Sequence, residues 1–310
     1  MLRMDGTMDT TVPLCGFELG PIRPPSEAYS LLIRATRNCP WNKCLFCHCY
    51  KDTEFSLRTV EEIERDIDTA REMRDRIVDA SDRLGYGGDV RLAAAALLSQ
   101  PFEDTCLRNV ALFLYGGGES VFLQDSNSLI MRTPDLVRIL LHLRDAFPGL
   151  SRVTTYSRAH TAAHKTLEEL KQIHEAGLVR IHLGLETGYD PLLEYIRKGT
   201  TAEQQISAGR KLNEAGFSVS EYVMPGLGGK AMAEGHVRET TRVLNAVNPA
   251  FIRLRSLHVT PTMPLWQQVQ DGSFQLQTED DVVREIEGLI EGLDVTSELK
   301  SDHILNLLME

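Results

Sequence analysis

The chain has 310 residues, of which 42% are hydrophobic and 25% are charged. This balance is typical of a globular protein with one large domain or two small ones, and it excludes a disordered chain. The 33 basic and 44 acidic side chains give a formal net charge of −11, which disfavours nonspecific attraction to nucleic acid. A DNA or tRNA substrate is therefore disfavoured.

The sequence contains no apolar segment that approaches the length of a membrane span. Its N-terminal residues carry early acidic side chains and no apolar signal core, so we expect a soluble protein in the cytoplasm. In that compartment, clustered thiols are expected to bind a metal rather than to form disulfides.

Between about residues 28 and 257, apolar runs typical of strands alternate with amphipathic runs typical of helices. Such alternation predicts an α/β fold with a parallel sheet. About six βα units are too few for a closed barrel of eight strands, so we expect an open, partial (β/α)6 TIM-like barrel. The strands are expected at residues 29–35, 109–115, 152–156, 179–185, 217–224 and 251–257.

Capping residues mark several helix boundaries. Thr59 and Glu62 have the spacing of a capping box at the start of the helix that follows the first strand. Ala-Gly pairs at residues 176–177 and 215–216 are typical of helix ends, because glycine readily adopts the left-handed backbone conformation.

We divide the chain into an N-terminal extension, a barrel and a C-terminal helical segment. Helices at residues 278–293 and 301–308 are expected to cover the open side of the barrel. Residues 81–108 contain several glycines and an Ala-rich run, and we expect them to be an insertion. The boundaries of the extension, the barrel and the C-terminal segment are residues 1–27, 28–260 and 261–310.

Four of the six cysteines lie within residues 37–51, in the sequence RNCPWNKCLFCHCYK. Closely spaced thiolates repel one another and oxidise readily, so this group indicates a soft metal ion or an iron–sulfur cluster. Four residues separate Cys39 from Cys44, and two separate Cys44 from Cys47. Cys49 follows after one further residue, which is too close for two corners of one cubane. We therefore expect three ligands, Cys39, Cys44 and Cys47.

Two other kinds of metal site use similar spacings. Plant-type ferredoxins combine the same four-then-two spacing with a distant fourth cysteine, for which Cys106 or Cys15 would have to serve. Such ferredoxins are small β-rich domains, unlike the rest of this chain. A zinc knuckle would need a second close pair of ligands, which only His48 and Cys49 are placed to supply.

The loop resembles the cluster loop of radical S-adenosylmethionine (SAM) enzymes, in which an aromatic residue precedes the third cysteine. Phe46 precedes Cys47 here, although four residues rather than the usual three separate the first two cysteines. The resemblance implies a [4Fe–4S] cluster held by three cysteines, with SAM on the remaining iron and Phe46 among the cofactor-binding residues. It also implies a low-potential electron donor of the flavodoxin or ferredoxin type.

A glycine-rich motif follows the strand expected at residues 109–115. In βα barrels the loops after the strands form the active face. The stretch Gly116–Glu119 resembles the GGE motif of this family, which implies that Gly117, Gly118 and Glu119 bind the amino group of SAM. The alternative for three glycines alone is a flexible turn.

Polar residues also follow the next two expected strands. Ser157 and Arg158 occupy a position where members of the family place side chains that touch the ribose or carboxylate of SAM. The next strand ends in LETG, similar to methylthiotransferases and oxygen-independent coproporphyrinogen oxidases, which implies that Glu186 accepts from ribose hydroxyls. Lys198, with Arg197 close behind, matches their cation for the SAM carboxylate. The alternative is a basic residue that stabilises a helix end.

The resemblance implies cleavage of SAM to a 5′-deoxyadenosyl radical that removes hydrogen from a small or medium organic substrate. Two alternatives stay open: cleavage of another C–S bond with aminocarboxypropyl transfer, and an iron–sulfur protein with an electron-transfer or structural role without SAM. The sequence has no second cysteine cluster and no basic RNA-binding appendage, which disfavours tRNA chemistry. His258 and Trp266 could contact a substrate, although such residues more often pack or face solvent.

Overall fold

The computed structural model describes residues 16–101 and 103–307. Seven parallel strands form one sheet in the order β1-β4-β5-β6-β7-β8-β9, and β2 and β3 form a separate antiparallel pair. The predicted α/β fold with a parallel sheet is confirmed. The strands are β1 (Leu31–Arg34), β2 (Thr36–Arg37), β3 (Ser56–Leu57), β4 (Ser120–Gln124), β5 (Arg152–Ser157), β6 (Leu178–Glu186), β7 (Ser218–Val223), β8 (Phe251–Leu254) and β9 (Glu298–Lys300).

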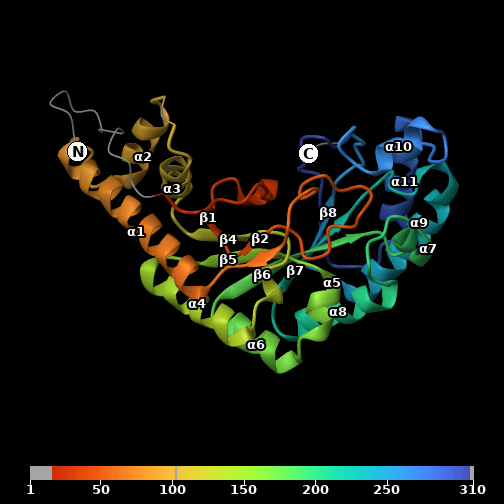
Figure 1. Cartoon of the computed structure of the whole chain (residues 1–310), viewed down its shortest axis with the longest axis horizontal. Coiled ribbons are helices and arrows are strands. Elements are labelled where there is room, and N and C mark those ends of the chain that lie inside the picture. The colour runs from red at the N-terminus through yellow and green to blue at the C-terminus, as the bar shows by residue number, and fades with distance from the viewer. Residues whose placement is uncertain (1–15, 102, 308–310) are drawn as a thin grey trace.

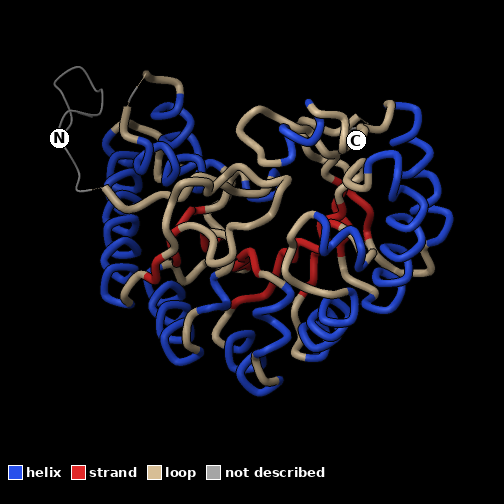
Figure 2. Tube along the Cα trace, turned by 45° about the vertical axis from the view of Figure 1, so that its right-hand side comes forward, coloured by secondary structure: helices blue, strands red, loops and turns tan. Residues whose placement is uncertain are grey.

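Helices cover the outer side of the curved sheet, and loops lie across its other side (Figure 1 and Figure 2). Helical crossovers between parallel neighbours give the open, partial barrel that the sequence predicts. The helices are α1 (Val60–Arg83), α2 (Val90–Leu98), α3 (Thr105–Tyr115), α4 (Thr133–Ala146), α5 (Ala159–His164), α6 (Leu167–Glu175), α7 (Asp190–Tyr195), α8 (Ala202–Glu214), α9 (Gly229–Val247), α10 (Leu265–Gln270) and α11 (Glu279–Gly292).

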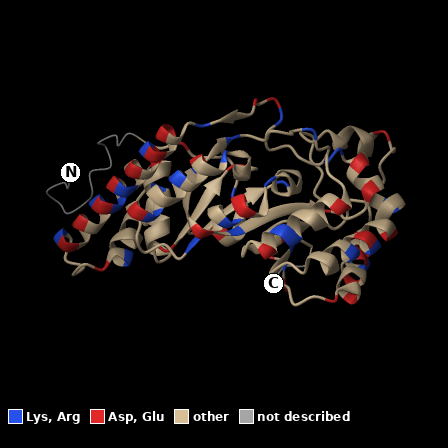
Figure 3. Cartoon of the chain, turned by 90° about the horizontal axis from the view of Figure 1, so that it is seen from below, with Lys and Arg blue, Asp and Glu red and all other residues tan. Residues whose placement is uncertain are grey.

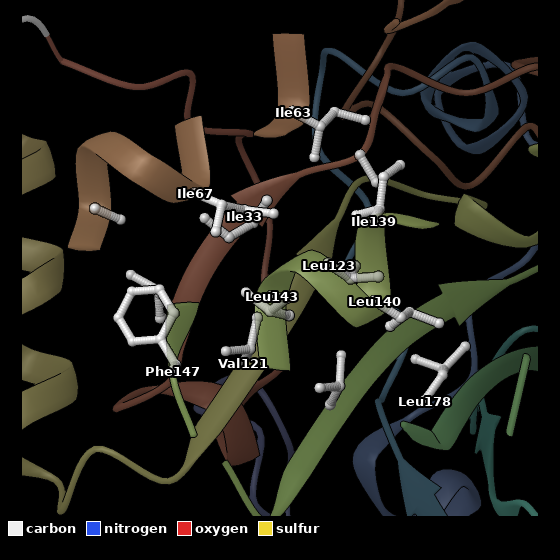
Figure 4. Close-up of a cluster of buried hydrophobic side chains, with 14 of the residues drawn as sticks. Ile33, Ile63, Ile67, Val121, Leu123, Ile139, Leu140, Leu143, Phe147 and Leu178 are labelled. Carbon is white, nitrogen blue, oxygen red and sulfur yellow. The ribbon is translucent and has the colours of Figure 1, made fainter. Parts of the chain in front are cut away.

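The largest hydrophobic core lies between the first strands and the helices outside them. Ile33 of β1 and Val121 of β4 belong to the same buried cluster as Ile63 of α1 (Figure 4). Helix α1 begins at the predicted capping box, in which the Thr59 hydroxyl accepts from the Glu62 amide and the Glu62 carboxylate accepts from the Thr59 amide. The cysteine-bearing loop therefore runs between two firmly packed elements, β1 and α1.

Residues 109–115 form the last part of helix α3 and not the predicted strand. Asp104 caps this helix by accepting from the amides of Cys106 and Leu107. The hydrophobic periodicity of so short an apolar run does not distinguish a buried strand from a buried helix. The Asp104 cap upstream is a helix signal, and the run is helical. The strand comes after the glycines instead, as β4 (Ser120–Gln124).

The C-terminal segment also differs from the prediction. Helix α11 is confirmed, but it connects β8 to β9 and packs beside α9 on the outer layer rather than covering the open side. The segment contributes a strand, β9, in addition to helices. Residues 301–307 form no helix, and residue 308 lies outside the described residues.

Residues 81–108 include α2, which packs against α1 and α3. Their status as an insertion, like the domain boundaries, stays a prediction.

Acidic and basic residues are interspersed along the outer helices (Figure 3). Arg138 of α4, for example, pairs with Glu61 and Glu64 of α1 at 3.2 and 2.6 Å. Such exposed ion pairs contribute little stability individually. No helix in the described part of the chain is long and apolar enough to cross a membrane.

Candidate active site

A cavity of about 600 Å³ opens where the strands of the sheet end. It lies between the cysteine loop (residues 37–51) and the chain segment at residues 20–25. Its volume falls in the range of roughly 300–1,000 Å³ that is usual for small-molecule sites. The carboxyl edge of a parallel sheet is also where βα proteins place their ligands. The residues in or just after the strands of this sheet that border the cavity are Leu32, Gln124, Ser126, Tyr156, Ser157, Arg158, Gly184, Glu186, Tyr222 and Arg255.

All four cysteines of the loop border this cavity, and each is partly exposed. Burial raises the pKa of Cys44 to about 11, and the charges of Cys47 and Cys39 act in the same direction, against Lys198. A hydrogen bond with Cys49 lowers the pKa of Cys47 to about 6, and the same bond raises the pKa of Cys49. The three predicted ligands therefore share one neighbourhood, with Cys49 against Cys47.

The cysteine loop is attached to the segment that follows α7. The Leu45 amide donates to the Ile196 carbonyl at 3.0 Å, and the Trp41 indole donates to the Arg197 carbonyl at 2.7 Å. Gly199 lies so close to the Trp41 ring that a Cβ there would collide with it. These contacts join segments that are far apart in the sequence, and they place the residue between Arg197 and Gly199 beside the thiols.

That residue is Lys198, whose Nζ donates to Glu186 Oε1 at 2.8 Å and lies 5.6 Å from the centroid of the Phe46 ring. Burial lowers the pKa of Lys198, but the charges of Glu186 and Cys44 outweigh this effect and leave the pKa above its usual value. Lys198 is therefore a charged ammonium in the cavity wall. The structure brings together Phe46, Glu186, Lys198 and the cysteines, as predicted.

Gly184 leaves room for the ion pair between Glu186 and Lys198. The sequence analysis did not predict this role for Gly184. A Cβ at Gly184 would lie 2.5 Å from Glu186 Oε1 and 2.8 Å from Lys198 Nζ. The pairing of β6 with β7 shifts register between Gly184 and Glu186, and Glu186 has a positive φ of 61°. Such a bulge redirects side chains at the end of a strand. Here the bulge lies next to Glu186, whose side chain borders the cavity.

Ser157 and Arg158 end β5 and border the same cavity. The Ser157 hydroxyl donates to Asn127 Oδ1 at 3.2 Å, and the Arg158 guanidinium donates to the Lys198 carbonyl at 3.0 Å. The Arg158 guanidinium also lies over the Trp41 ring, 4.9 Å from its centroid. Both residues are therefore where the sequence predicted them, at the cysteine-bearing edge of the sheet.

The end of β4 contributes a polar loop that the sequence analysis missed. Asp125 is fully buried and accepts from the Tyr50 hydroxyl at 2.7 Å and the Asn38 amide at 2.9 Å, and it pairs with Arg34 at 2.7 Å. The Ser126 hydroxyl donates to the Asn38 carbonyl at 3.0 Å. The peptide bond before Asp125 is cis. An available signal was the apolar run SVFLQ followed by the polar residues Asp-Ser-Asn.

The predicted role of Gly117, Gly118 and Glu119 is wrong because these residues lie at the other end of β4. The Glu119 carbonyl accepts from the amides of Ser151 and Arg152, where β5 begins. A strand of this length spans about 15 Å, at about 3.3 Å per residue. The glycine motif is thus at the amino edge of the sheet, and none of its three predicted binding residues borders the cavity.

The segment at residues 20–25 forms another wall of the cavity. Gln124 at the end of β4 fixes this segment, because its side-chain amide donates to the carbonyls of Gly20 and Ile22 at 3.1 and 3.0 Å and accepts from the Gly20 amide at 2.8 Å. Part of the expected N-terminal extension is therefore built into the site.

Four further residues on the cavity wall were not predicted from the sequence. The rings of Tyr156 and Tyr222 lie 6.2 Å apart on neighbouring parts of the sheet. Arg255 follows β8, and His303 comes from the C-terminal segment. Burial raises the pKa of Tyr222 to about 12, so its hydroxyl stays protonated in the physiological range.

Other candidates from the sequence do not reach the cavity. Cys106, proposed as a fourth ligand of a ferredoxin-like cluster, lies in the core and donates its thiol to the Phe17 carbonyl at 3.0 Å. Cys15 lies outside the described residues. His258 and Trp266 do not border the cavity. Within the described residues, no three His, Cys, Asp or Glu side chains are grouped tightly enough to hold a single metal ion, a closer grouping than the separate irons of a cluster require.

Residues 33–239, more than half of the chain, match the family model described as the Radical SAM superfamily. The tRNA uridine(34) acetyltransferase of Methanocaldococcus jannaschii is 37% identical over 65 residues, which are 21% of this chain and 12% of that protein. The protein of the same name from Methanocaldococcus infernus is 31% identical over 65 residues, with the same coverage. The match thus covers a small part of either relative.

Solved structures share the fold at low sequence identity. Coproporphyrinogen III oxidase from Escherichia coli has a TM-score of 0.53 and 16% identity, over 85% of this chain and 52% of that one. A radical SAM methyltransferase from Kitasatospora setae has a TM-score of 0.53 and 16% identity, over 84% of this chain and 44% of that one. Methylornithine synthase has a TM-score of 0.50 and 14% identity, over 86% and 66%.

Proposed function

Because the chain belongs to the radical SAM superfamily, we propose that the cavity beside the cysteine loop is its active site and that Cys39, Cys44 and Cys47 hold the cluster there. The chain is an enzyme of this class, and its cofactors are a [4Fe–4S] cluster and SAM. The donor set suits a cubane, since three soft thiols border one cavity while the fourth, Cys49, is hydrogen-bonded to Cys47.

The observation that carries this proposal is that the thiols share one cavity with Ser157, Arg158, Glu186 and Lys198. A reduced cluster held by these cysteines would supply the electron that breaks a C–S bond of SAM, and the reaction we propose is removal of a hydrogen atom from the substrate by the resulting 5′-deoxyadenosyl radical. The protein must then orient SAM and keep water from the reacting groups.

We assign the orientation of SAM to charged and polar groups on the cavity wall. Lys198, a buried cation, would attract the SAM carboxylate, and Arg158 would add a second positive charge. Glu186 retains acceptor capacity for ribose hydroxyls beyond its bond to Lys198. Ser157 would contribute a hydroxyl group, and Phe46 an apolar surface.

The amino group of SAM requires a different site from the one predicted. The family resemblance places this site after the second strand of the sheet, and β4 is the second strand. We therefore assign residues 124–126 the role first given to Gly117, Gly118 and Glu119. Ser126 borders the cavity, and Asp125 holds this loop to the cysteine loop through Tyr50 and Asn38.

The substrate in this proposal is a small or medium organic molecule. The curated relatives are named for a tRNA uridine, but the match covers only 21% of this chain, and a net charge of −11 disfavours RNA. A low-potential donor of the flavodoxin or ferredoxin type, and a cytoplasmic location where such donors operate, belong to the same proposal.

The test is anaerobic reconstitution with iron and sulfide, followed by reduction with dithionite and addition of SAM. We expect the EPR signal of a four-iron cluster to change when SAM is added, and 5′-deoxyadenosine to form. The substitutions C39A, C44A and C47A should each abolish both results. The matched control C106A should retain them, because Cys106 lies in the core away from the cavity.

Different products would identify the alternatives. Methylthioadenosine in place of 5′-deoxyadenosine would indicate cleavage of another C–S bond, with transfer of the aminocarboxypropyl group. A two-iron spectrum that does not respond to SAM, or bound zinc alone, would contradict the proposal and indicate an electron-transfer or structural metal site.

A further inference from the structure

The cavity has an excess of positive charge, although the chain as a whole is acidic. Arg23, Arg158, Lys198 and Arg255 border it, and Glu186 is the only carboxylate among the described residues that do so. Glu186 is already paired with Lys198, and the Arg158 guanidinium donates to backbone carbonyls. At least one cation of the wall is therefore available for an anionic ligand.

Arg255 is the most enclosed of the available cations. Its amide donates to the Val223 carbonyl at 2.9 Å, so its backbone is fixed where β8 runs beside the end of β7. The guanidinium forms no hydrogen bond or ion pair with any residue that the structure describes, and it borders the cavity together with Tyr156 and Tyr222. A partly buried guanidinium without an acidic partner is favourably matched by an anion.

A second donor comes from the C-terminal strap, which we define as residues 301–307. Asp302 pairs with Arg253 of β8 at 2.5 Å, and the Asn306 side chain bonds to the Leu254 carbonyl at 2.9 Å. These bonds hold His303 at the cavity. Nδ1 of His303 accepts from the amide of a strap residue at 3.2 Å, so the neutral ring carries its hydrogen on Nε2.

We propose that Arg255 and His303 bind an oxyanion, a carboxylate or a phosphate, of the substrate. A guanidinium offers two parallel N–H donors that match either group, and the Nε2–H of His303, which borders the same cavity, adds a third. Tyr156 of β5 and Tyr222 of β7 border the same cavity, with their ring centroids 6.2 Å apart. This inference rests on the proposed function, because it places the substrate in the same cavity as SAM.

The test uses the reconstituted holoenzyme with SAM, titrated calorimetrically with two probes, succinate and inorganic phosphate. We expect at least one probe to bind the natural enzyme. The substitution R255Q should weaken that binding by about 10- to 100-fold, the usual effect of losing a charge-assisted hydrogen bond. R255K should weaken it less, and H303Q should also weaken it. The control R132Q, at an exposed arginine on the rim of α4, should leave it unchanged.

The choice of probe separates a carboxylate from a phosphate, since preference for succinate indicates the first and preference for phosphate the second. The inference is overturned if neither probe binds, or if R255Q binds the probes as tightly as the natural enzyme. It is also overturned if R255Q loses SAM and retains the probes, because Arg255 would then serve the SAM carboxylate. If R255Q does not fold, as judged by circular dichroism, R255K decides: weaker probe binding supports the site, and unchanged binding contradicts it.

The proposed function is tested separately by 5′-deoxyadenosine formation in the natural enzyme. If no adenosyl product forms while probe binding depends on Arg255, the oxyanion site stands and the proposed function fails. If the product forms and probe binding does not depend on Arg255, the proposed function stands and the oxyanion site fails.

Discussion

The Lys198 ammonium lies 2.8 Å from the Glu186 carboxylate in a pair whose side chains are only 11% and 12% exposed. Glu186 ends β6, and the chain returns to it after the short helix α7. Breaking a buried pair on one side leaves the other charge without compensation. The pair is thus both a structural element and the part of the cavity wall best placed to meet the charges of SAM.

Lys198→Met should weaken SAM binding at least tenfold and lower 5′-deoxyadenosine formation, because the ammonium that faces the SAM carboxylate is lost. It should also destabilise the fold by about 1–3 kcal/mol, since Glu186 would be left partly buried without its partner. Equilibrium dialysis with SAM and urea unfolding measure the two effects. Lys171→Met, at an exposed site on α6, is the control. Unchanged SAM affinity would remove Lys198 from the site.

Gly184→Ala should disturb the same pair without changing any charge. The new methyl group would approach Glu186 Oε1 and Lys198 Nζ to within about 3 Å, so one of these side chains must move. We expect weaker SAM binding with retained iron content, because the atoms nearest to the new methyl group belong to Glu186 and Lys198 and not to a cysteine. Gly149→Ala is a matched control, since nothing lies within 4 Å of a Cβ there. Equal SAM affinities for the two variants would contradict this role.

Asp125→Asn should lower the amount of iron that the protein retains. The carboxylate joins the β4 end to the cysteine loop through Tyr50 and Asn38, and it pairs with Arg34 at 2.7 Å. Loss of its charge leaves the largely buried Arg34 less compensated, which should destabilise the fold by about 2 kcal/mol or more. Iron assays after reconstitution and urea unfolding provide the measurements. The substitution Asp79→Asn, at an exposed position on α1, should change neither, and a full complement of iron in D125N would refute the link.

Local signals in the sequence predicted the elements that they directly encode. The capping box of Thr59 and Glu62 begins α1, and Ser157 follows its strand as expected. These features depend on a few neighbouring residues, which is why a single sequence reveals them. The prediction of Lys198 as a site residue came from the resemblance to radical SAM enzymes. The contacts of Trp41 with the segment around Lys198 bring this residue to the cysteines.

Features that depend on distant parts of the chain were missed. The apolar run at residues 109–115 suits a strand or a helix, and its misassignment moved the glycine motif to the wrong edge of the sheet. Asp125 becomes important only through Tyr50 and Arg34, which the fold brings to it. His303 reaches the cavity because Asp302 and its neighbours hold the C-terminal strap to β8. No local pattern marks such contacts.

Glu221 makes the stability of the protein depend on pH. This side chain of β7 is 2% exposed, and burial raises its pKa from 4.5 to about 8, with the charge of Glu186 acting in the same direction and Lys198 against it. Between these two pH values the folded protein retains a proton that the unfolded chain has lost. The contribution of Glu221 to stability is therefore present below pH 4.5, falls as the pH rises, and is lost above pH 8.

Glu221→Gln keeps the size of the side chain and removes this titration. The free energy of unfolding of the natural protein, relative to E221Q, should decrease by about 3 kcal/mol between pH 5.5 and pH 8. Urea unfolding at intervals across this range measures the difference, and Glu214→Gln, at an exposed position, should give a profile parallel to that of the natural protein. A difference between the natural protein and E221Q that does not vary with pH would show that Glu221 is ionised in the folded state. The carboxylate would then need a cationic partner, and Lys198, which already balances Glu186, is the one whose charge reaches it.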